Sequence, residues 1–394
     1  MNFREQDGKL ILSLTGRIDT NNAAGTEQEI TEILSSHQGM TPAFDAKDLT
    51  YISSAGLRVL MKIRKQAGAA IEVFDVPPEV YDIFETTGFT ELLSVTKKLR
   101  ELSIDGCEKI GEGANGAVYR IDDETIIKVF APGVPMKTVQ EERDFARAAF
   151  VAGVPTAIAY DVVKVGDAYG AVYEMLRAKT LSTVIMEDTD RAEEFGRRMG
   201  TLLKEMHQTP ADTKKLNNML EVYKDRARRM GKYLNPQEHE MLLRIYDALD
   251  ERTTLVHGDY HCKNIMYMND ELIFIDMGDV GYGHPLLDLG GTYLAMGRLR
   301  MMGDEIVRRY IGLSADACGR VYDAMMLAYF GEKDVAAGEE LVRIYGEAKY
   351  ALTPFLYSKA TEEMAKQMVE RARANGFFTD GFDITPAFHR NISF

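Results

Sequence analysis

The sequence HGDYHCKN at residues 257–264, followed by FIDMG at residues 274–278, is more informative than any other part of this chain. It sets Asp259, Asn264 and Asp276 at a fixed spacing. A carboxylate can accept the proton of an attacking hydroxyl, and amide and carboxylate oxygens are hard ligands for Mg2+. This combination of residue types is typical of a site that transfers a phosphoryl group.

The residues around this stretch predict a β-hairpin. Apolar segments at 265–268 and 272–275 are expected to be strands, and Asn269-Asp270 between them is a turn signal. Such a hairpin would hold Asp276 at the end of a buried strand. The alternative is a polar loop that is rich in His and Asp by chance. Spacing, residue type and flanking strands together favour the functional interpretation.

A second motif lies upstream, in KIGEGANGAVY at residues 109–119, which contains Gly-x-Gly-x-x-Gly at Gly111, Gly113 and Gly116. Dinucleotide-binding folds share this pattern, and there the glycines open a helix. Here they lead into an apolar strand at 117–121 instead. Strand, turn and strand after the glycines is the arrangement that covers ATP phosphates in kinases.

The next predicted strand, residues 125–130, carries Lys128. At this distance from the glycines, a lysine is expected to hold the α and β phosphates of ATP; a solvated edge lysine is the alternative. The lysine needs a carboxylate partner. A helix predicted at 138–151 offers Glu141 and Glu142.

The catalytic-loop pattern resembles the aminoglycoside phosphotransferase and choline kinase family, in which His-Gly-Asp-x-His-x-x-Asn precedes a metal-binding Ile-Asp. The resemblance continues through GHPLLDL at residues 283–289. It implies that Asp259 is the catalytic base and that Asn264 and Asp276 are the Mg2+ ligands. It also implies that Asp288 is a structural acid bracing the loop.

The same resemblance covers the small lobe. The family's Glu-x-x-x-Ala-x-Ala pattern matches residues 142–148 and implies Glu142 as the lysine's partner, whereas Glu141 fits a solvated helix face. Residues 168–176 resemble the last small-lobe strand and the hinge, where backbone groups from Glu174 to Leu176 would bind adenine. Lys263 departs from the family's usual Pro-Gly, and we expect it to point to solvent rather than toward the phosphates.

Residues 1–100 follow a different pattern, in which strands and helices alternate. Strands are predicted at 9–16, 43–45 and 71–74, and helices at 22–35, 55–67 and 78–86. This alternation indicates a small α/β domain.

Within it, DLTYISSAGLRVL at residues 48–60 resembles the signature of the STAS domain, the anti-sigma-factor antagonist fold. In that family a serine at a helix start is phosphorylated by a partner kinase, and Ser54 matches it. A phosphate there would interact favourably with the helix dipole and would disturb a docked partner. Ser53 stands where phosphorylated members carry Asp. The alternative is that Ser54 is an ordinary N-cap.

The expected fold is therefore an α/β STAS-like domain at 1–100, followed by an α+β protein-kinase-like bilobal domain at 101–394. Its small lobe would span about 106–176, and a largely helical C-terminal lobe would span 177–394. Residues 1–100 show no paired acids, metal cluster or activated nucleophile, so the first domain is expected to regulate or recruit.

The composition of the chain limits the kinds of partner that it is expected to bind. A net charge of -14 argues against a broad nucleic-acid or anionic-membrane surface, because such partners require clustered Lys and Arg. Three widely separated cysteines suggest reduced thiols in the cytoplasm, and no apolar run is long enough for a membrane helix.

The sequence thus predicts a phosphotransferase that uses ATP and Mg2+ on a hydroxyl of a small molecule. The alternative is a partner-switch signalling protein whose kinase-like domain senses nucleotide or phosphorylates protein. Acidic stretches at 339–340 and 362–363 could recognise a cationic acceptor, but such stretches are more often solvated helix faces. The terminal Ser393-Phe394 resembles aminoglycoside kinases whose C-terminus lines the acceptor site.

Overall fold

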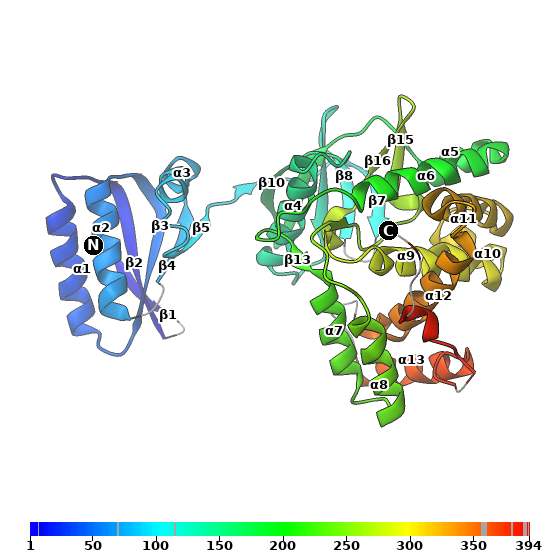
Figure 1. Cartoon of the computed structure of the whole chain (residues 1–394). Coiled ribbons are helices and arrows are strands. Elements are labelled where there is room, and N and C mark those ends of the chain that lie inside the picture. Colours follow the sequence, from blue (N-terminus) through cyan, green and yellow to red (C-terminus); the bar gives the residue numbers. More distant parts are fainter. Residues whose placement is uncertain are drawn as a thin grey trace. The chain divides into compact units, whose positions relative to one another are not determined.

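The computed structural model describes residues 1–6, 8–68, 71–113, 116–355, 361–379, 381–388, 392 and 394. The chain divides into two compact units, Met1–Leu102 and Ser103–Phe394 (Figure 1). Ala114 and Asn115 of the glycine motif, and Ser393, lie outside the described residues.

The first unit is a sheet whose strands lie in chain order and are connected by helices. The strands are β1 (Phe3–Gln6), β2 (Lys9–Ile18), β3 (Thr41–Ile52), β4 (Glu72–Val76) and β5 (Ser94–Lys97). β1 is antiparallel to β2, and the other neighbours are parallel. The helices are α1 (Ala23–Ser36), α2 (Ser54–Ala67) and α3 (Pro78–Thr86), and α1 and α2 lie side by side (Figure 1). A two-residue strand, β6 (Arg100–Glu101), ends the unit.

The core of this unit forms because apolar side chains of the strands and helices meet between them. Leu12 of β2, Phe44 of β3, Leu60 of α2 and Phe84 of α3 are all buried there. Parallel strands need such crossover helices, so the predicted α/β class is confirmed.

Three strands differ from the sequence-based expectation. β3 is much longer than the predicted 43–45. The prediction was too short because polar residues interrupt the apolar pattern of the strand. Asp45, within the predicted segment, is polar but buried, and Arg4 of the edge strand β1 satisfies it by donating a hydrogen bond at 3.0 Å. β1 is exposed along its whole length and β5 is mostly polar, so neither shows an apolar signal.

The second unit begins with a sheet of antiparallel neighbours. In spatial order these are β10 (Ala159–Val165), β11 (Ala168–Glu174), β9 (Thr125–Phe130), β8 (Gly116–Arg120) and β7 (Glu108–Gly113). Helix α4 (Met136–Val151) packs against β10 and β11. This is the predicted small lobe.

The glycine motif lies in the hairpin of β7 and β8, so a strand and not a helix follows it. The dinucleotide-binding alternative is therefore excluded. Gly116 is needed for close approach, because a Cβ there would lie 2.1 Å from the carbonyl oxygen of Val129. No side chain fits between β8 and β9 at this point.

The remainder is largely helical. Its helices are α5 (Leu181–Glu187), α6 (Ala192–Met206), α7 (Met219–Met230), α8 (Pro236–Asp247), α9 (Leu286–Thr292), α10 (Asp304–Tyr310), α11 (Ala315–Phe330), α12 (Val335–Ala351) and α13 (Glu362–Ala374). A π-helical segment, η4 (Tyr293–Arg298), and a 3-10 turn, η5 (Leu299–Met302), continue α9. Within the part of the chain that the structure describes, no helix is both long and apolar enough to cross a bilayer.

Helices α6 and α11 pack closely against each other. A Cβ on Gly196 would lie 2.4 Å from the carbonyl oxygen of Val321, and one on Gly200 would lie 2.5 Å from that of Met325. Small residues at these two positions let the backbones touch. The pair supports Tyr260 of the predicted catalytic loop (residues 257–264), because the Tyr260 hydroxyl donates to the carbonyl oxygen of Met199 on α6.

We predict that Gly200→Ala destabilises the second unit by about 1–3 kcal/mol, because the added methyl group overlaps backbone atoms. Gly319→Ala on α11 is the matched control, since its Cβ would meet only the end of the Arg300 side chain, at 3.3 Å. It should be neutral or slightly stabilising. Urea unfolding followed by circular dichroism measures both; equal midpoints would contradict the packing argument.

Candidate active site

The catalytic loop runs from β14 (Leu255–Val256) through a 3-10 turn, η2 (Cys262–Asn264), into the predicted hairpin. Its strands are β15 (Ile265–Met268) and β16 (Glu271–Phe274), which are antiparallel. The turn residues Asn269 and Asp270 have positive φ angles of 51° and 65°, which these two residue types tolerate. The hairpin prediction is confirmed.

This hairpin brings Asn264 and Asp276 together. The amide of Ile275 donates to the carbonyl oxygen of Asn264 at 3.0 Å, which fixes the residue before Asp276 beside the catalytic loop. Asp276 itself has left-handed backbone angles, φ 57° and ψ 56°. This conformation turns the chain sharply at the end of β16, and half of the Asp276 side chain is exposed.

Lys128 joins the two lobes of the second unit. Its ammonium group donates to Glu142 Oε1 at 2.7 Å and to Asp276 Oδ1 at 2.8 Å. Burial by itself lowers the pKa of Lys128, but the charges of Asp276 and Glu142 outweigh it and hold the pKa above its ordinary value. The lysine is therefore a permanent cation at the place where the sequence predicts ATP phosphates.

Glu142, and not Glu141, faces the lysine. Burial raises the pKa of Glu142, and the Lys128 charge opposes that rise. Tyr173 of β11 donates to the same carboxylate oxygen at 3.4 Å. A Cβ on Gly278 would lie 2.9 Å from Glu142 Cδ, so glycine is required where the loop after Asp276 passes α4. Glu141 lies on the solvent side, 3.6 Å from Lys137.

Asp259 and Asn264 form the second half of the site. Asn264 Nδ2 donates to the carbonyl oxygen of Asp259 at 2.9 Å and to its Oδ2 at 3.1 Å. Burial raises the pKa of Asp259, but the hydrogen bond and charge of His261 and the charge of Lys349 lower it by more, so the pKa lies well below its usual range. Asp259 is therefore ionised at neutral pH.

The arrangement fits Mg2+. Because Asn264 uses its NH2 group on Asp259, its amide oxygen remains for a cation, and Asp276 contributes a half-exposed carboxylate. Mg2+ usually takes one or two protein oxygens and completes its shell with phosphates and water. Among the described residues there is no cluster of three or more His, Cys, Asp or Glu that would form a closed metal site.

Asp288 of α9 binds the backbone of the predicted catalytic loop. Its carboxylate accepts hydrogen bonds from the backbone amides of His257 and Gly258, both at 2.5 Å, and lies 3.1 Å from His207 Nε2. Burial raises the pKa of Asp288, and the His207 hydrogen bond together with charges and the amides lowers it by more. The bracing role implied by the family resemblance thus has a direct structural counterpart.

Sequence reasoning missed two residues of this site, Lys349 and His207. The buried Lys349 on α12 donates to the carbonyl oxygen of Gly258 at 2.8 Å. Burial lowers its pKa, but the hydroxyl of Tyr223 and the charge of Asp259 keep it above the ordinary value. The sequence offered one signal for Lys349, namely a lysine placed among mostly apolar residues near Tyr345.

The expected adenine contacts lie at the end of β11. The amide of Met175 is already bonded to the carbonyl oxygen of Glu124 at 2.8 Å, and Glu174 Oε2 accepts from the amide of Ile158 at 3.2 Å. Within the described part of the chain, the Leu176 amide has no backbone acceptor. This amide can therefore donate to an adenine, and the assignment of residues 174–176 to the adenine-binding hinge stays a prediction.

The ammonium group of Lys263 donates to the carbonyl oxygen of Arg309 at 3.1 Å, in an exposed position. The expected orientation toward solvent is thus compatible with the structure, with one backbone contact that the sequence did not indicate. Phe394 packs against His284 and Phe330, with ring centroids 4.8 and 5.9 Å away.

In the first unit, Ser53 is the N-cap of α2. Its hydroxyl accepts from the amides of Ala55 and Gly56 at 3.2 and 3.5 Å. The interpretation of Ser54 as the helix cap is therefore wrong. Ser54 is the first helical residue, and its side chain is exposed.

Comparison with known proteins agrees with these two folds. The sequence model of the phosphotransferase enzyme family matches residues 106–352, more than half of the chain. The chain belongs to the phosphotransferase enzyme family. The STAS domain model matches residues 1–102, so this family member carries an N-terminal STAS domain.

Individual relatives are distant for the phosphotransferase part and nearer for the STAS domain. BtrV of Bordetella bronchiseptica, named as a candidate anti-sigma factor antagonist, is 33% identical over 92 residues, which is 23% of this chain and 78% of BtrV. A choline/ethanolamine kinase family protein from Mesorhizobium loti is 17% identical with a TM-score of 0.46, covering 72% of this chain and 91% of that one. The ADP-bound aminoglycoside phosphotransferase APH(2'')-Ib is 16% identical with a TM-score of 0.46, covering 74% and 96%.

We predict that Asp288→Asn costs about 3 kcal/mol of unfolding free energy at neutral pH, because an amide cannot accept all three buried donors. Asp247→Asn is the matched control. Its carboxylate is 64% exposed and pairs with Lys224, so it should change stability by less than about 0.5 kcal/mol.

The Asp288 effect should depend on pH. The pKa of Asp288 is lower in the folded chain than in the unfolded one, so its contribution is complete above the unfolded value of about 4 and disappears as the pH falls through the folded value. The difference in urea midpoint between the wild type and Asp288→Asn should therefore be largest at pH 7 and should shrink progressively as the pH is lowered below about 4. A constant difference would show that packing, and not charge, dominates.

Proposed function

We propose that this chain is a phosphotransferase that uses ATP and Mg2+ to phosphorylate a hydroxyl group of a small molecule, with the STAS domain as a regulatory or docking module. The observation that carries the proposal is that Lys128 contacts both Glu142 and Asp276, at 2.7 and 2.8 Å. Asp259 and Asn264 are hydrogen-bonded to each other in the predicted catalytic loop. A degenerate relative that only binds nucleotide would have no need to preserve all five.

Each residue then has a distinct part in the reaction. Lys128, fixed by Glu142, holds the α and β phosphates, and the amide at Leu176 faces the adenine edge. Asn264 and Asp276 would hold Mg2+, which would neutralise charge on the phosphates when bound. Phosphoryl transfer has a loose transition state, so positioning contributes more to catalysis than basicity.

Asp259 acts on the acceptor. Its low pKa makes it a weak base, so it orients the hydroxyl first and takes the proton only as the new bond forms. The acceptor oxygen forms a bond to the γ-phosphorus while the bond to the β–γ bridging oxygen breaks. The products are the phosphorylated acceptor, ADP and a proton that passes to Asp259.

The STAS domain is suited to regulation. It has its own apolar core, and its helix α2 presents Ser54 to solvent one residue after the cap. A phosphate at Ser54 would lie in the first turn, where negative charge is favourable. It would also place up to about two charges on a surface that a protein partner can read.

We predict that Asp259→Asn lowers the rate of ADP formation by about 10²–10⁴-fold and leaves Mg-ATP affinity within threefold, because Asp259 acts on the acceptor. Asp276→Ala should weaken Mg-ATP binding by at least about tenfold, because it removes a metal ligand. Thermal-shift titration with Mg-ATP measures binding by linkage, and coupled ADP detection with a panel of hydroxyl acceptors measures transfer.

Glu141→Gln serves as the control for that comparison, since Glu141 lies on the same helix as Glu142 and faces solvent. It should resemble the wild type in both assays. No thermal shift of the wild type at millimolar Mg-ATP would remove the kinase proposal, and identical behaviour of Asp259→Asn and Asp276→Ala would overturn the division of roles.

We predict that a chain beginning at Glu101 keeps Mg-ATP binding and basal transfer, while Ser54→Asp in the full chain changes partner binding or activity. Ser35→Asp, on the exposed end of α1, is the matched control for added charge. Loss of nucleotide binding in the shortened chain would show that the first unit completes the kinase fold. A silent Ser54→Asp, with no phosphate found at Ser54 by mass spectrometry, would leave Ser54 without a regulatory role.

A further inference from the structure

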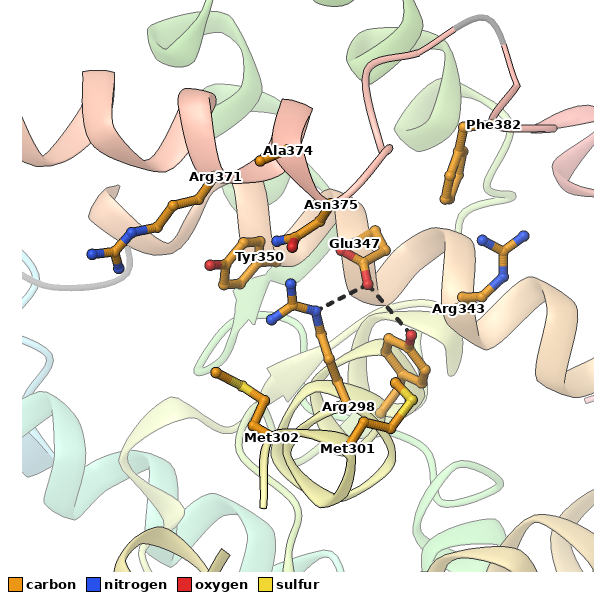
Figure 2. A pocket seen from close by; sticks show the side chains of 11 residues that line it. Arg298, Met301, Met302, Arg343, Glu347, Tyr350, Arg371, Ala374, Asn375 and Phe382 are labelled. Carbon is orange, nitrogen blue, oxygen red and sulfur yellow. Dashed lines mark hydrogen bonds and ion pairs between the residues drawn. The ribbon is translucent and has the colours of Figure 1, made fainter. Parts of the chain in front are cut away.

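A pocket of about 740 Å3 in the helical lobe is lined by residues of η4, η5, α12 and α13 (Figure 2). Its Arg343 and Arg371 side chains point to opposite sides, so they do not form one binding group. The contacts of α9 and α12 with the catalytic loop come from Thr292 and Lys349, which are not part of the lining. The polar groups that touch Asp259 lie in the loop itself.

The loop contains two histidines, His257 and His261, that have no part in the reaction proposed above. Both contact Asp259. The ring Nδ1 of the buried His257 accepts a hydrogen bond from the backbone amide of Asp259 at 3.3 Å. Nε2 of His261 lies 3.4 Å from the carboxylate oxygen Oδ2 of Asp259. One histidine therefore contacts the backbone of the aspartate, and the other contacts the group that would act on the acceptor.

The two carboxylate oxygens of Asp259 have different surroundings. Oδ2 accepts a hydrogen bond from Asn264 Nδ2 at 3.1 Å and also faces His261 Nε2. Within the described part of the chain, no hydrogen bond or ion pair reaches Oδ1. Because the Asp259 side chain is 53% exposed, an acceptor hydroxyl can approach this second oxygen. A carboxylate that is held by one oxygen presents the other in a fixed direction.

The surroundings of the His261 ring decide which of its nitrogens carries the proton. The side chain is only 14% exposed, and Nδ1 is buried without a hydrogen-bond partner among the described residues. A proton on Nδ1 would have no acceptor, which is unfavourable for a buried N–H group. It would also leave the lone pair of Nε2 facing a carboxylate. Nε2 is therefore the donor, and it shares Oδ2 with Asn264.

Both donors come from the same short turn. The amide of Asn264 donates to the carbonyl oxygen of His261 at 2.9 Å, which closes η2 between them. The backbone thus holds the histidine ring and the asparagine amide beside Asp259. Asn264 is also a proposed Mg2+ ligand, and His261 is not. A change of the His261 side chain therefore tests the orientation of Asp259 without removing a metal ligand.

We propose that His261 is a positioning residue of this phosphotransferase, and that it holds Oδ2 of Asp259 so that Oδ1 takes the proton of the acceptor hydroxyl. This inference rests on the proposed kinase function. The acceptor oxygen forms its bond to the γ-phosphorus, the bond to the β–γ bridging oxygen breaks, and the hydroxyl proton moves to Oδ1. His261 contacts none of these reacting atoms and acts through the carboxylate alone.

Two variants separate the hydrogen bond from the bulk of the ring. His261→Leu removes the donor and keeps an apolar side chain, whereas His261→Gln supplies an amide NH2 donor in place of Nε2. ADP formation from Mg-ATP is measured with water as the attacking hydroxyl and with a panel of hydroxyl acceptors. It should fall at least about tenfold in His261→Leu, because a misplacement of about 1 Å costs up to about 10²-fold in rate. His261→Gln should recover to within about threefold of the wild type, and KM for Mg-ATP should change less than about twofold in both variants.

The effect should vanish when there is no carboxylate to hold. In an Asp259→Ala background, adding His261→Leu should change the remaining rate by less than about twofold, because the two side chains act as one unit. The same fold-loss in both backgrounds would show that His261 only stabilises the loop, and would overturn the proposal. Full activity of His261→Leu, or no recovery in His261→Gln, would also overturn it.

His37→Leu is the matched control for the loss of a histidine beside a carboxylate. His37 Nε2 lies 3.6 Å from Glu5 Oε1 in the first unit, away from the residues of the proposed reaction. This variant should form ADP at the rate of the wild type. A loss equal to that of His261→Leu would show that the assay does not report on Asp259, and would contradict the part assigned to His261.

A spectroscopic measurement tests the same contact without turnover. Nitrogen NMR of the full chain with 15N-labelled histidine reports which ring nitrogens carry protons, and the spectrum of His261→Gln identifies the His261 signals. We expect a proton on Nε2 at neutral pH. A ring that carries its proton on Nδ1 and leaves Nε2 bare would overturn the proposal.

The two proposals fail in different ways. A wild type that shows no thermal shift with Mg-ATP and forms no ADP with any acceptor would contradict the kinase function itself. A wild type that binds Mg-ATP and forms ADP, together with an unimpaired His261→Leu, would leave the kinase function intact and contradict only the part assigned to His261.

Discussion

One ammonium group, that of Lys128, connects the parts of the second unit on which its chemistry depends. It contacts a carboxylate from helix α4 and another from the loop after β16, residues separated by 14 and 148 positions in the chain. A buried cation is tolerated only with such partners. Without it, two carboxylates would face each other across the lobe connection, so sheet, helix and loop take their relative places through this contact.

The contact also bears on the proposed reaction. In the chain alone, Lys128 neutralises Asp276. In the proposed kinase, a nucleotide with its metal would bring both a negative partner for the lysine and a positive partner for the aspartate. The same three groups would then exchange partners without leaving any charge uncompensated.

The catalytic loop is irregular, so it cannot satisfy its backbone through helix or sheet bonds. Side chains do this instead. Asp288 accepts two of the loop's amides, and Lys349 and Thr292 donate to two of its carbonyl oxygens. All three side chains come from α9 and α12, which lie against each other. The rigidity of the loop is therefore a property of the helical lobe.

Sequence patterns located the features whose physical cause is local. The hairpin around Asn269-Asp270, the strand that carries Lys128 and the helix that carries Glu142 follow from periodicity, turn chemistry and motif spacing. Lys349 and His207 could not be found in this way, because their partners lie far along the chain. The interpretation of Ser54 as the helix cap was wrong by one residue, because the cap is Ser53. The two neighbouring serines are the same residue type, so only their backbone angles distinguish the cap from the first helical residue.

The π-helical segment η4 has a geometric consequence of its own. In an α-helix, residues five apart are rotated by about 140° around the axis and face different directions. In a π-helical turn, i→i+5 bonding brings them onto one side. Tyr293 and Arg298 are five apart, and both reach Glu347 Oε1. One residue more than an α-helical turn holds is therefore enough to direct both side chains at the same carboxylate, while the helices on either side keep their packing.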